Sequence, residues 1–231
     1  MMGKLSIVST PIGNLEDITL RALSTLKACD LILAEDTRTT IGFLKHYDIP
    51  PKEVVSFFEG NEEGKINFAI TSILQGKHLA LVSESGTPLI SDPGYKLVRE
   101  AIKAGVVIES IPGPTALISA LTVSGLPTNA FLFLGFLPKK ESHSRKLLIQ
   151  ARDAIQDIEQ LKTIVFYESP HRLVKTLHLI KVVFGELQIV VARELTKMHE
   201  EVRRERVGEA IEHFNKDKPR GEITVLLSIE K

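Results

Sequence analysis

The sequence contains one cysteine, Cys29, and no excess of either charge, with 29 lysines and arginines against 29 aspartates and glutamates. A single cysteine excludes disulfides within the chain and metal sites built from cysteines. Because Cys29 stands among apolar residues of a helical pattern, we expect it to be a buried core thiol. Zero net charge excludes a global positive field that would attract nucleic acid, so any RNA contact must come from local basic patches.

Long apolar runs are also missing. No stretch approaches the roughly 18 uninterrupted apolar residues that a membrane helix needs. The first residues, Met1 to Lys4, lead directly into a strand pattern and lack the apolar core and cleavage site of a secretory signal. Hydrophobic residues make up 43% and charged residues 25% of the chain, which is typical of a globular protein. We therefore expect a cytoplasmic location and no membrane contact.

Motifs of several familiar chemistries are absent. The first strand is not followed by G-x-G-x-x-G, and the sequence has no G-x-x-x-x-G-K-[ST], H-E-x-x-H or G-x-S-x-G. Hydride transfer, nucleotide hydrolysis and the serine hydrolase elbow therefore lose support. The seven histidines are scattered rather than set at ligand spacing, so we expect no bound metal. His171 stands beside Glu168 at the start of a helical pattern, where an exposed first-turn side chain is the favoured interpretation.

Strand-like runs alternate with helical periodicities in the first half of the chain, a βαβ rhythm. The predicted strands are 4–9, 31–34, 54–58, 78–83 and 106–111. Four helices are predicted between them: one that carries Leu20, Leu23 and Leu26, one at 37–46, one that begins at Asn61 and one at 93–104. These strands read as continuous apolar runs. Such runs are typical of a mainly parallel sheet that is covered by helices on both faces.

The rhythm changes after Pro112, which indicates a second domain. The predicted helices there are 115–124, about 142–161, one opened by Ser169-Pro170 and 208–214, and the predicted strands are 130–137, 163–167, 188–192 and 221–229. We therefore expect an α/β fold of two α/β domains, residues 1–113 and 114–231. The sequence shows no internal repeat and no low-complexity segment.

Loops of small residues follow three of the predicted strands. They are 9–14, 83–94 and 112–116, and they concentrate Ser, Thr, Gly and Pro. In α/β proteins the carboxyl ends of the strands are where ligands bind, and small residues let backbone N–H groups approach a ligand. We expect Asp92 to cap a helix with Pro93 at its first position. Each loop alone could be a tight turn, but three together indicate one shared ligand edge.

Two basic groups are candidates for RNA contact. The first comprises Lys139, Lys140, Arg145 and Lys146, after the apolar run 131–137. The second comprises Arg203, Arg204 and Arg206, and it is interleaved with Glu200, Glu201 and Glu205. The favoured interpretation of the second group is a solvated surface whose charges pair with one another.

Seven motifs in order resemble the tetrapyrrole methylase superfamily, and within it the family that methylates small-subunit ribosomal RNA. The motifs are Ser9-Thr10-Pro11-Ile12-Gly13-Asn14-Leu15, Ala34-Glu35-Asp36-Thr37-Arg38, the 83–94 loop, Pro112-Gly113-Pro114, Gly135-Phe136-Leu137-Pro138, Phe166-Tyr167-Glu168-Ser169-Pro170-His171-Arg172 and Arg193-Glu194-Leu195-Thr196-Lys197. The resemblance runs from about Leu5 to Leu227. One departure is Glu84-Ser85, where the family pattern has Asp followed by Ala, so the carboxylate stands one methylene further out.

The resemblance implies an enzyme that uses S-adenosylmethionine to methylate the ribose 2′-hydroxyl of a cytidine in the decoding region of 16S ribosomal RNA. It also implies a homodimer and a donor site in the cleft between the two domains. The implied donor residues are Pro11, Ile12, Gly13, Asn14, Glu84, Ser85, Gly86, Thr87, Ile90, Thr115 and Ala116 from the first domain, and Tyr167, Glu168, Arg193 and Glu194 from the second. Plainer interpretations stay open for some of them: Thr115 as a helix cap, Tyr167 as core, and Arg193 with Glu194 as a surface ion pair.

Methyl transfer is an in-line displacement that needs alignment and a dry cleft but no metal. A base that removes the hydroxyl proton would accelerate it. Glu168 is the first candidate, because the start of the next helix and Arg172 could position its carboxylate, and Glu35 and Asp36 are the second candidates. The expected phosphate contacts are Arg38, Lys139, Lys140, Arg145, Arg172 and Arg193.

Two other functions stay open. An enzyme of the same superfamily could methylate a carbon of a tetrapyrrole or precorrin ring, although such a substrate gives no reason for the basic segment Lys139 to Lys146. A non-catalytic ribosome-binding module could keep the fold, but it would have no reason to bind S-adenosylmethionine. A measurement of donor binding separates this module from an enzyme.

Overall fold

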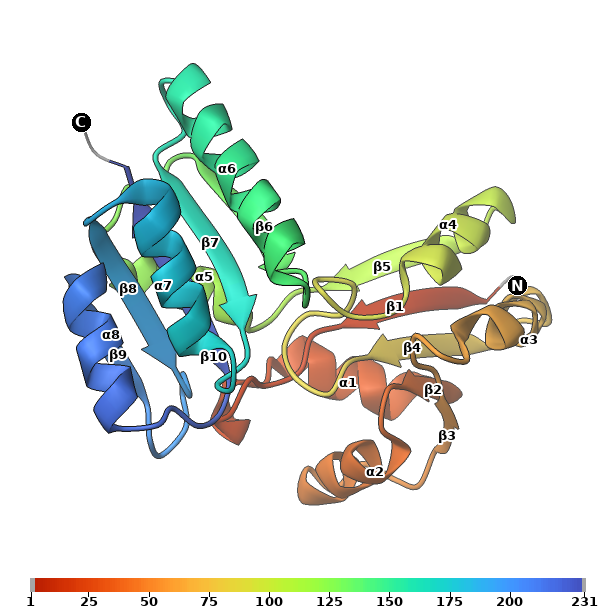
Figure 1. Ribbon diagram of the computed structural model, residues 1–231. Coiled ribbons are helices and arrows are strands. Elements are labelled where there is room, and N and C mark those ends of the chain that lie inside the picture. The colour runs from red at the N-terminus through yellow and green to blue at the C-terminus, as the bar shows by residue number, and fades with distance from the viewer. Residues whose placement is uncertain (1–2, 230–231) are drawn as a thin grey trace. The chain divides into compact units, whose positions relative to one another are not determined.

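The computed structural model describes residues 3–229 (Figure 1). Met1 and Met2, which precede the first predicted strand, lie outside the described residues. The chain divides after Thr115 into two compact units. Each unit is built on a five-stranded sheet with helices packed against it. Within residues 3–229 no helix is long and apolar enough to cross a membrane. The predicted α/β fold with two α/β domains is confirmed.

The first unit contains an entirely parallel sheet in the order β3-β2-β4-β1-β5. Its strands are β1 (Lys4–Val8), β2 (Leu31–Ala34), β3 (Glu53–Ser56), β4 (His78–Val82) and β5 (Val107–Ile111). Its helices are the 3-10 helix η1 (Leu15–Asp17), α1 (Leu20–Ala28), α2 (Thr37–His46), α3 (Glu62–Leu74) and α4 (Tyr95–Lys103). Because all five strands run the same way, their carboxyl ends lie at one edge.

Two buried clusters cover the two faces of this sheet. Leu79 and Leu81 of β4 pack with α3 and α4, whereas Ala80 and Val82 pack with α1 and α2. Alternate residues of a strand point to opposite faces, so this division shows that helices cover both sides. Cys29 lies in the second cluster, where burial raises the pKa of its thiol to about 11. The predicted core thiol is confirmed.

The second unit contains a mixed sheet in the order β6-β7-β10-β8-β9. Its strands are β6 (Phe131–Phe136), β7 (Thr163–Glu168), β8 (Gln188–Arg193), β9 (Glu201–Arg206) and β10 (Ile223–Ser228). Its helices are α5 (Ala116–Ser124), α6 (Glu141–Asp157), α7 (Leu173–Phe184) and α8 (Val207–Lys216). Strands β6 and β7 pair in parallel, and the other pairs are antiparallel.

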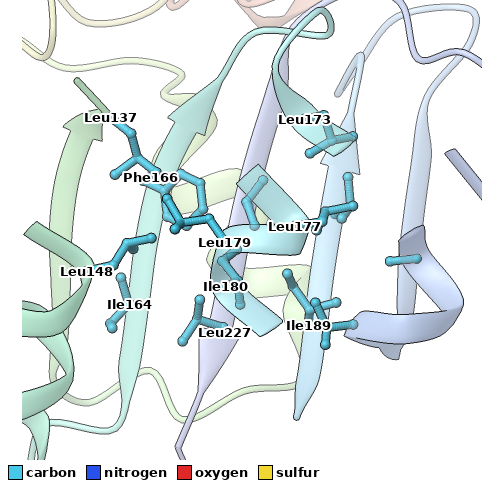
Figure 2. Packing of buried hydrophobic residues seen from close by; sticks show 14 of the residues in the cluster. Leu137, Leu148, Ile164, Phe166, Leu173, Leu177, Leu179, Ile180, Ile189 and Leu227 are labelled. Atoms are coloured by element: carbon cyan, nitrogen blue, oxygen red, sulfur yellow. The ribbon is translucent and has the colours of Figure 1, made fainter. Parts of the chain in front are cut away.

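The core of the second unit lies between the sheet and helices α6, α7 and α8. Figure 2 shows Phe166 of β7 and Leu177 and Ile180 of α7 facing one another, and all three are fully buried. Helix α5 contacts β7, β9 and β10 on the opposite face (Figure 1). The sheet is therefore covered by helices on both sides.

Helix α4 begins later than the sequence predicts. Asp92 is not its cap and Pro93 is not its first residue, because the helix begins at Tyr95 and the capping position is Gly94, at φ +126°. The N–H of Gly94 donates to the buried Glu62 carboxylate at 3.3 Å. A partner from α3 therefore decides where this helix begins, and the local sequence pattern does not show that partner.

Two further local predictions are wrong. Helix α7 begins at Leu173 rather than at Ser169-Pro170, because residues 169–172 form a turn against the Glu168 carboxylate. Strand β9 is missing from the predicted strands, since its charged residues read as a solvated surface. It is an edge strand that pairs with β8 alone, which leaves its charged side chains in contact with solvent.

The glycine at the start of α4 gives a test of the fold. We expect Gly94→Ala to lower the free energy of unfolding by about 1–3 kcal/mol, because a Cβ there would lie 2.7 Å from Cδ2 of Leu81 and φ is positive. Gly42→Ala in α2 is the matched control, since nothing lies within 4 Å of its Cβ, and a gain of about 0.5–1 kcal/mol is expected. Urea unfolding measures both, and equal stabilities would contradict the prediction.

Candidate functional site

The loops after β1, β4 and β5 are joined directly at the carboxyl edge of the first sheet. The N–H of Thr10 donates to the carbonyl of Gly86 at 2.8 Å, and the N–H of Gly86 donates back at 3.1 Å. The Ser9 hydroxyl lies 2.9 Å from the Thr87 hydroxyl, which donates to the carbonyl of Pro114 at 3.1 Å. The prediction that these three loops share one edge is confirmed.

Two glycines allow this close approach. A Cβ at Gly113 would lie 2.9 Å from Cβ of Ser9, and a Cβ at Gly86 would lie 3.1 Å from Cγ2 of Ile12. Gly86 also has φ +81°, a conformation that a side chain disfavours. In the sequence, the small residues are explained by the close approach of a ligand. In the structure, Gly86 and Gly113 are required because the loops pack closely against one another. The loops thus pack closely into one continuous surface.

Left-handed backbone conformations occur in two of the segments that are predicted to bind the methyl donor. Among residues 3–229, five residues other than glycine have positive φ, and four of them lie in these segments. Leu89 and Ser91 belong to the 83–94 loop, and Glu194 and Thr196 to the segment after β8. Such conformations cost of order 1–3 kcal/mol each and cluster at functional sites. The strain therefore supports both segments as candidates.

Two carboxylates follow neighbouring strands at the edge of the first sheet. Glu35 follows β2 directly and Glu84 follows β4 by two residues, and these strands pair with Ala34 opposite Val82. Burial, and then the charge of Glu84, raise the pKa of Glu35 above its ordinary value. A half-buried carboxyl group whose pKa is raised by a second carboxylate is typical of a functional site.

Two predicted site residues are helix caps. Asp36 caps α2 by accepting the N–H groups of Arg38 at 2.7 Å and Thr39 at 3.3 Å. The hydrogen bond from the Arg38 side chain lowers the pKa of Asp36 below its ordinary value, which makes Asp36 a weaker base. Asn14 caps η1 by accepting the N–H of Glu16 at 3.0 Å. The Arg38 side chain is 90% exposed, so its guanidinium is accessible to a phosphate.

Glu168 stands at the end of β7, fully buried, with both carboxylate oxygens engaged. Its Oε1 lies 2.6 Å from Nη2 of Arg172 and accepts the N–H of Ser169 at 2.7 Å. Its Oε2 accepts the hydroxyl of Thr176 at 2.6 Å. A buried ion pair needs such further hydrogen bonds to offset desolvation. Three of the about four acceptor sites of this carboxylate are therefore already used within the protein.

Arg172 links this buried carboxylate to the turn after β6. Its Nη1 donates to the carbonyls of Leu137 at 3.0 Å and Pro138 at 3.2 Å. We call the set of contacts from Glu168 through Arg172 to these carbonyls the Arg172 strap. Both terminal nitrogens of Arg172 thus have protein partners, so its geometry supports a structural role better than the predicted phosphate contact.

Arg193 and Glu194 each pair with other residues rather than with one another. Nη2 of Arg193 lies 3.0 Å from Glu201, which stands opposite it in the β8–β9 register. Glu194 accepts Nζ of Lys197 at 3.0 Å. Tyr167 is half-buried, and its ring contacts Phe133.

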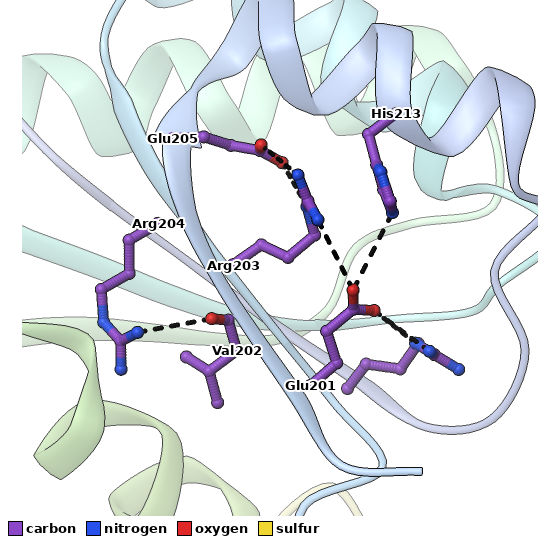
Figure 3. Close-up of polar contacts among 7 residues, drawn as sticks. Glu201, Val202, Arg203, Arg204, Glu205 and His213 are labelled. Carbon is purple, nitrogen blue, oxygen red and sulfur yellow. Dashed lines mark hydrogen bonds and ion pairs between the residues drawn. The ribbon is translucent and has the colours of Figure 1, made fainter.

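The second basic group pairs with its acidic neighbours only at Arg203, whereas the side chains of Arg204 and Arg206 donate to backbone carbonyls. Arg203 donates two hydrogen bonds to Glu205, at 2.8 and 2.7 Å, and lies 3.6 Å from Glu201. Figure 3 shows Glu201 between Arg203 and His213. Arg204 donates to the carbonyl of Val123 at 3.0 Å. These guanidinium groups are therefore already engaged within the protein.

The first basic group differs from the second. Lys139, Lys140, Arg145 and Lys146 are all exposed. Within residues 3–229, none of these four side chains forms an ion pair with a carboxylate. Their charges are therefore available to an external anion.

Sequence reasoning missed the partners that hold two of the candidates. Thr176, which binds Glu168, follows Arg172 by four residues, so helical spacing could have indicated it. Glu201, which binds Arg193, is a cross-strand partner. Its role could be recognised only once β9 was known to be a strand.

Comparison with known proteins agrees with this architecture. The family described as Tetrapyrrole (Corrin/Porphyrin) Methylases matches residues 4–211. Ribosomal RNA small subunit methyltransferase I of Thermotoga maritima is 50% identical over 98% of this chain and 99% of its own length. The protein of the same name from Escherichia coli O157:H7 is 44% identical over 99% of this chain and 78% of its own length.

Solved structures share the fold at lower identity. Uroporphyrin-III C-methyltransferase from Thermus thermophilus, complexed with S-adenyl homocysteine, matches with a TM-score of 0.65 at 18% identity over 97% of both chains. A diphthine synthase matches with a TM-score of 0.73 at 15% identity over 97% of this chain and 90% of its own. These likenesses show the fold alone, whereas the sequence relatives show the family. The resemblance carried by the seven motifs is confirmed, and the chain belongs to the tetrapyrrole methylase family, in the group of ribosomal RNA small subunit methyltransferase I.

Proposed function

We propose that this protein transfers a methyl group from S-adenosylmethionine to the ribose 2′-hydroxyl of a cytidine in the decoding region of 16S ribosomal RNA. The observation that carries the proposal is the 50% identity, over nearly the full length of both chains, to a ribosomal RNA small subunit methyltransferase I. The solved tetrapyrrole C-methyltransferases are only 17–21% identical. Methylation of a tetrapyrrole carbon therefore has less support.

The donor site is proposed at the carboxyl edge of the first sheet, and the family resemblance adds the segment after β8. The joined loops offer hydroxyl and backbone groups for an amino-acid tail, and Ile90, 41% exposed, offers apolar surface for an adenosyl group. Glu84 supplies negative charge suited to a sulfonium or an ammonium. When bound, S-adenosylmethionine supplies an electrophilic methyl group. A related fold complexed with S-adenyl homocysteine supports the choice of donor.

Glu35 is the proposed base. Its carboxyl is half-buried and its raised pKa makes its carboxylate a better proton acceptor than an ordinary glutamate. As the ribose oxygen bonds to the methyl carbon and the carbon–sulfur bond breaks, the Glu35 carboxylate takes the hydroxyl proton. Glu168 stays a predicted base, but its three internal hydrogen bonds support a positioning role better.

Phosphate contacts are proposed from Arg38 and from the first basic group, whose charges have no carboxylate partner among the described residues. Because the net charge is zero, affinity for RNA depends on these local groups. The homodimer and the cytoplasmic location stay predictions from the family resemblance.

The decisive experiment combines donor binding with label transfer. We expect the purified protein to bind S-adenosylmethionine in calorimetry and to transfer a radiolabelled methyl group to unmodified small ribosomal subunits, with the label mapped by nuclease digestion to one cytidine ribose. Absence of donor binding would favour a non-catalytic module. Label on a base or on an added tetrapyrrole would contradict the 2′-O assignment.

A pair of isosteric variants separates the two candidate bases. We expect Glu35→Gln to keep donor binding and to lower kcat by about 100-fold or more. In the unmodified enzyme, kcat/KM should fall as pH drops through a pKa above the about 4.3 of an ordinary glutamate, because the base must be ionised. Glu168→Gln should mainly lower Tm, since it weakens the buried pair with Arg172. Loss of turnover in Glu168→Gln at unchanged Tm and donor affinity would instead make Glu168 the base.

Salt titration tests the phosphate contacts. The double variant Lys139→Gln/Lys140→Gln should bind RNA more weakly and reduce the slope of log K against log salt by roughly 0.7 for each phosphate that is no longer neutralised. The control is Lys216→Gln/Lys218→Gln, which removes the same charge from exposed positions elsewhere in the second unit. Similar slopes for the two variants would show that Lys139 and Lys140 do not bind phosphate.

A further inference from the structure

A group of three aromatic rings lies at the carboxyl ends of β6 and β7. The Tyr167 ring packs edge-on against Phe133 with 5.1 Å between ring centroids, and it lies 5.4 Å from Phe136 at an interplanar angle of 57°. Phe133 and Tyr167 are half-buried, whereas Phe136 is 56% exposed. The ring of Phe136 thus meets solvent, and Tyr167 packs against both phenylalanines.

A β-bulge produces this arrangement. Phe133 pairs with Val165 and Phe136 pairs with Tyr167, so β6 advances three residues where β7 advances two. In a regular strand, residues three apart point to opposite faces. The extra residue, with Gly135 at φ +63°, turns Phe136 to the side on which Phe133 already lies. This explains how both phenylalanines contact the ring of Tyr167.

The backbone beyond Phe136 is fixed as well. Leu137 is 2% exposed and belongs to the core of the second unit. The Arg172 strap holds the carbonyls of Leu137 and Pro138, and its other end is the buried Glu168. Phe136 therefore stands between a bulge and an anchored turn. An exposed ring held this rigidly loses little conformational entropy when a ligand stacks on it.

Positive charge follows this ring closely in the sequence. Lys139 and Lys140 follow Phe136 by three and four residues, both are exposed, and neither forms an ion pair among residues 3–229. A stacking ring beside accessible cations is the combination by which proteins bind single-stranded nucleic acid, because the ring takes a base and the cations take phosphates. A protein-docking patch would instead place further exposed apolar side chains at these positions.

We propose that Phe136 stacks on an unpaired nucleobase of the ribosomal RNA substrate, and that the Arg172 strap positions it. This inference rests on the proposed function and names the substrate contact of the second unit. Stacking is tolerant of base identity, so Phe136 contributes affinity and orientation rather than sequence preference. Tyr167 packs against the Phe136 ring, and Phe133 packs against Tyr167.

Substitution of the ring tests the proposal in the full-length protein. We expect Phe136→Ala to weaken binding to a fluorescent, unpaired RNA oligonucleotide by about 5- to 100-fold, and to raise KM for small subunits while donor affinity stays unchanged. Phe136→Tyr should keep most of the binding, because the ring remains. Phe68→Ala is the matched control, since Phe68 is a 40% exposed phenylalanine on α3.

The site of stacking is tested by 2-aminopurine placed in turn at each unpaired position of the oligonucleotide. Binding should quench one position with the unmodified enzyme and with Phe136→Tyr, and not with Phe136→Ala. If Phe136→Ala matches the unmodified enzyme in RNA affinity, in KM and in quenching while label transfer to small subunits persists, the stacking role is overturned and the proposed function stands. If the unmodified protein neither binds donor nor transfers label, the proposed function itself fails.

Discussion

Parallel pairing of the first sheet is the constraint on which the candidate site depends. Five parallel strands must all end at one edge, so the loops that leave β1, β4 and β5 meet there and have to pack against one another. The same pairing places Glu35 and Glu84 after neighbouring strands. Burial, and then the charge of Glu84, raise the pKa of Glu35 above its ordinary value. The chemistry proposed for Glu35 therefore follows from strand order as much as from the residue itself.

The second unit uses a different device, a buried ion pair whose two partners also form further hydrogen bonds within the protein. Glu168 accepts from Ser169 and Thr176 in addition to Arg172, and Arg172 donates to two carbonyls. Removing one partner of such a pair typically costs about 3–5 kcal/mol, because the other charge stays buried and unpaired. The pair thus holds three segments together, namely the end of β7, the start of α7 and the turn after β6. A charged motif need not be reactive to be indispensable for positioning a reactive surface.

Local patterns predict the elements that local interactions determine. The helix expected at 37–46 is α2, and the apolar runs at 31–34 and 78–83 are β2 and β4, because propensity and periodicity there agree with burial. The start of α4 depends on Glu62, a residue 32 positions earlier, and the β6 bulge depends on the register of β7. Strand β9 could not be recognised because its sequence consists mainly of charged residues, and its pairing with β8 is not visible in the local pattern. For the site, the motifs favour Glu168 over Glu35 as the base, whereas burial and hydrogen bonding in the structure favour Glu35.

Equal numbers of acidic and basic residues conceal an uneven distribution of available charge. In β9 the arginines stand beside glutamates at alternating or neighbouring positions, and Arg203 is held by Glu205 and Glu201. At the start of α6 the basic residues have no such partners among the described residues. Composition counts both groups equally, but of the two only the basic residues at the start of α6 offer an anion a favourable potential. In β9 an existing ion pair must be broken before its arginine can bind an external anion. A neutral protein can therefore bind a polyanion where its cations lack internal partners, and a fixed aromatic ring beside them gives that attraction a defined geometry.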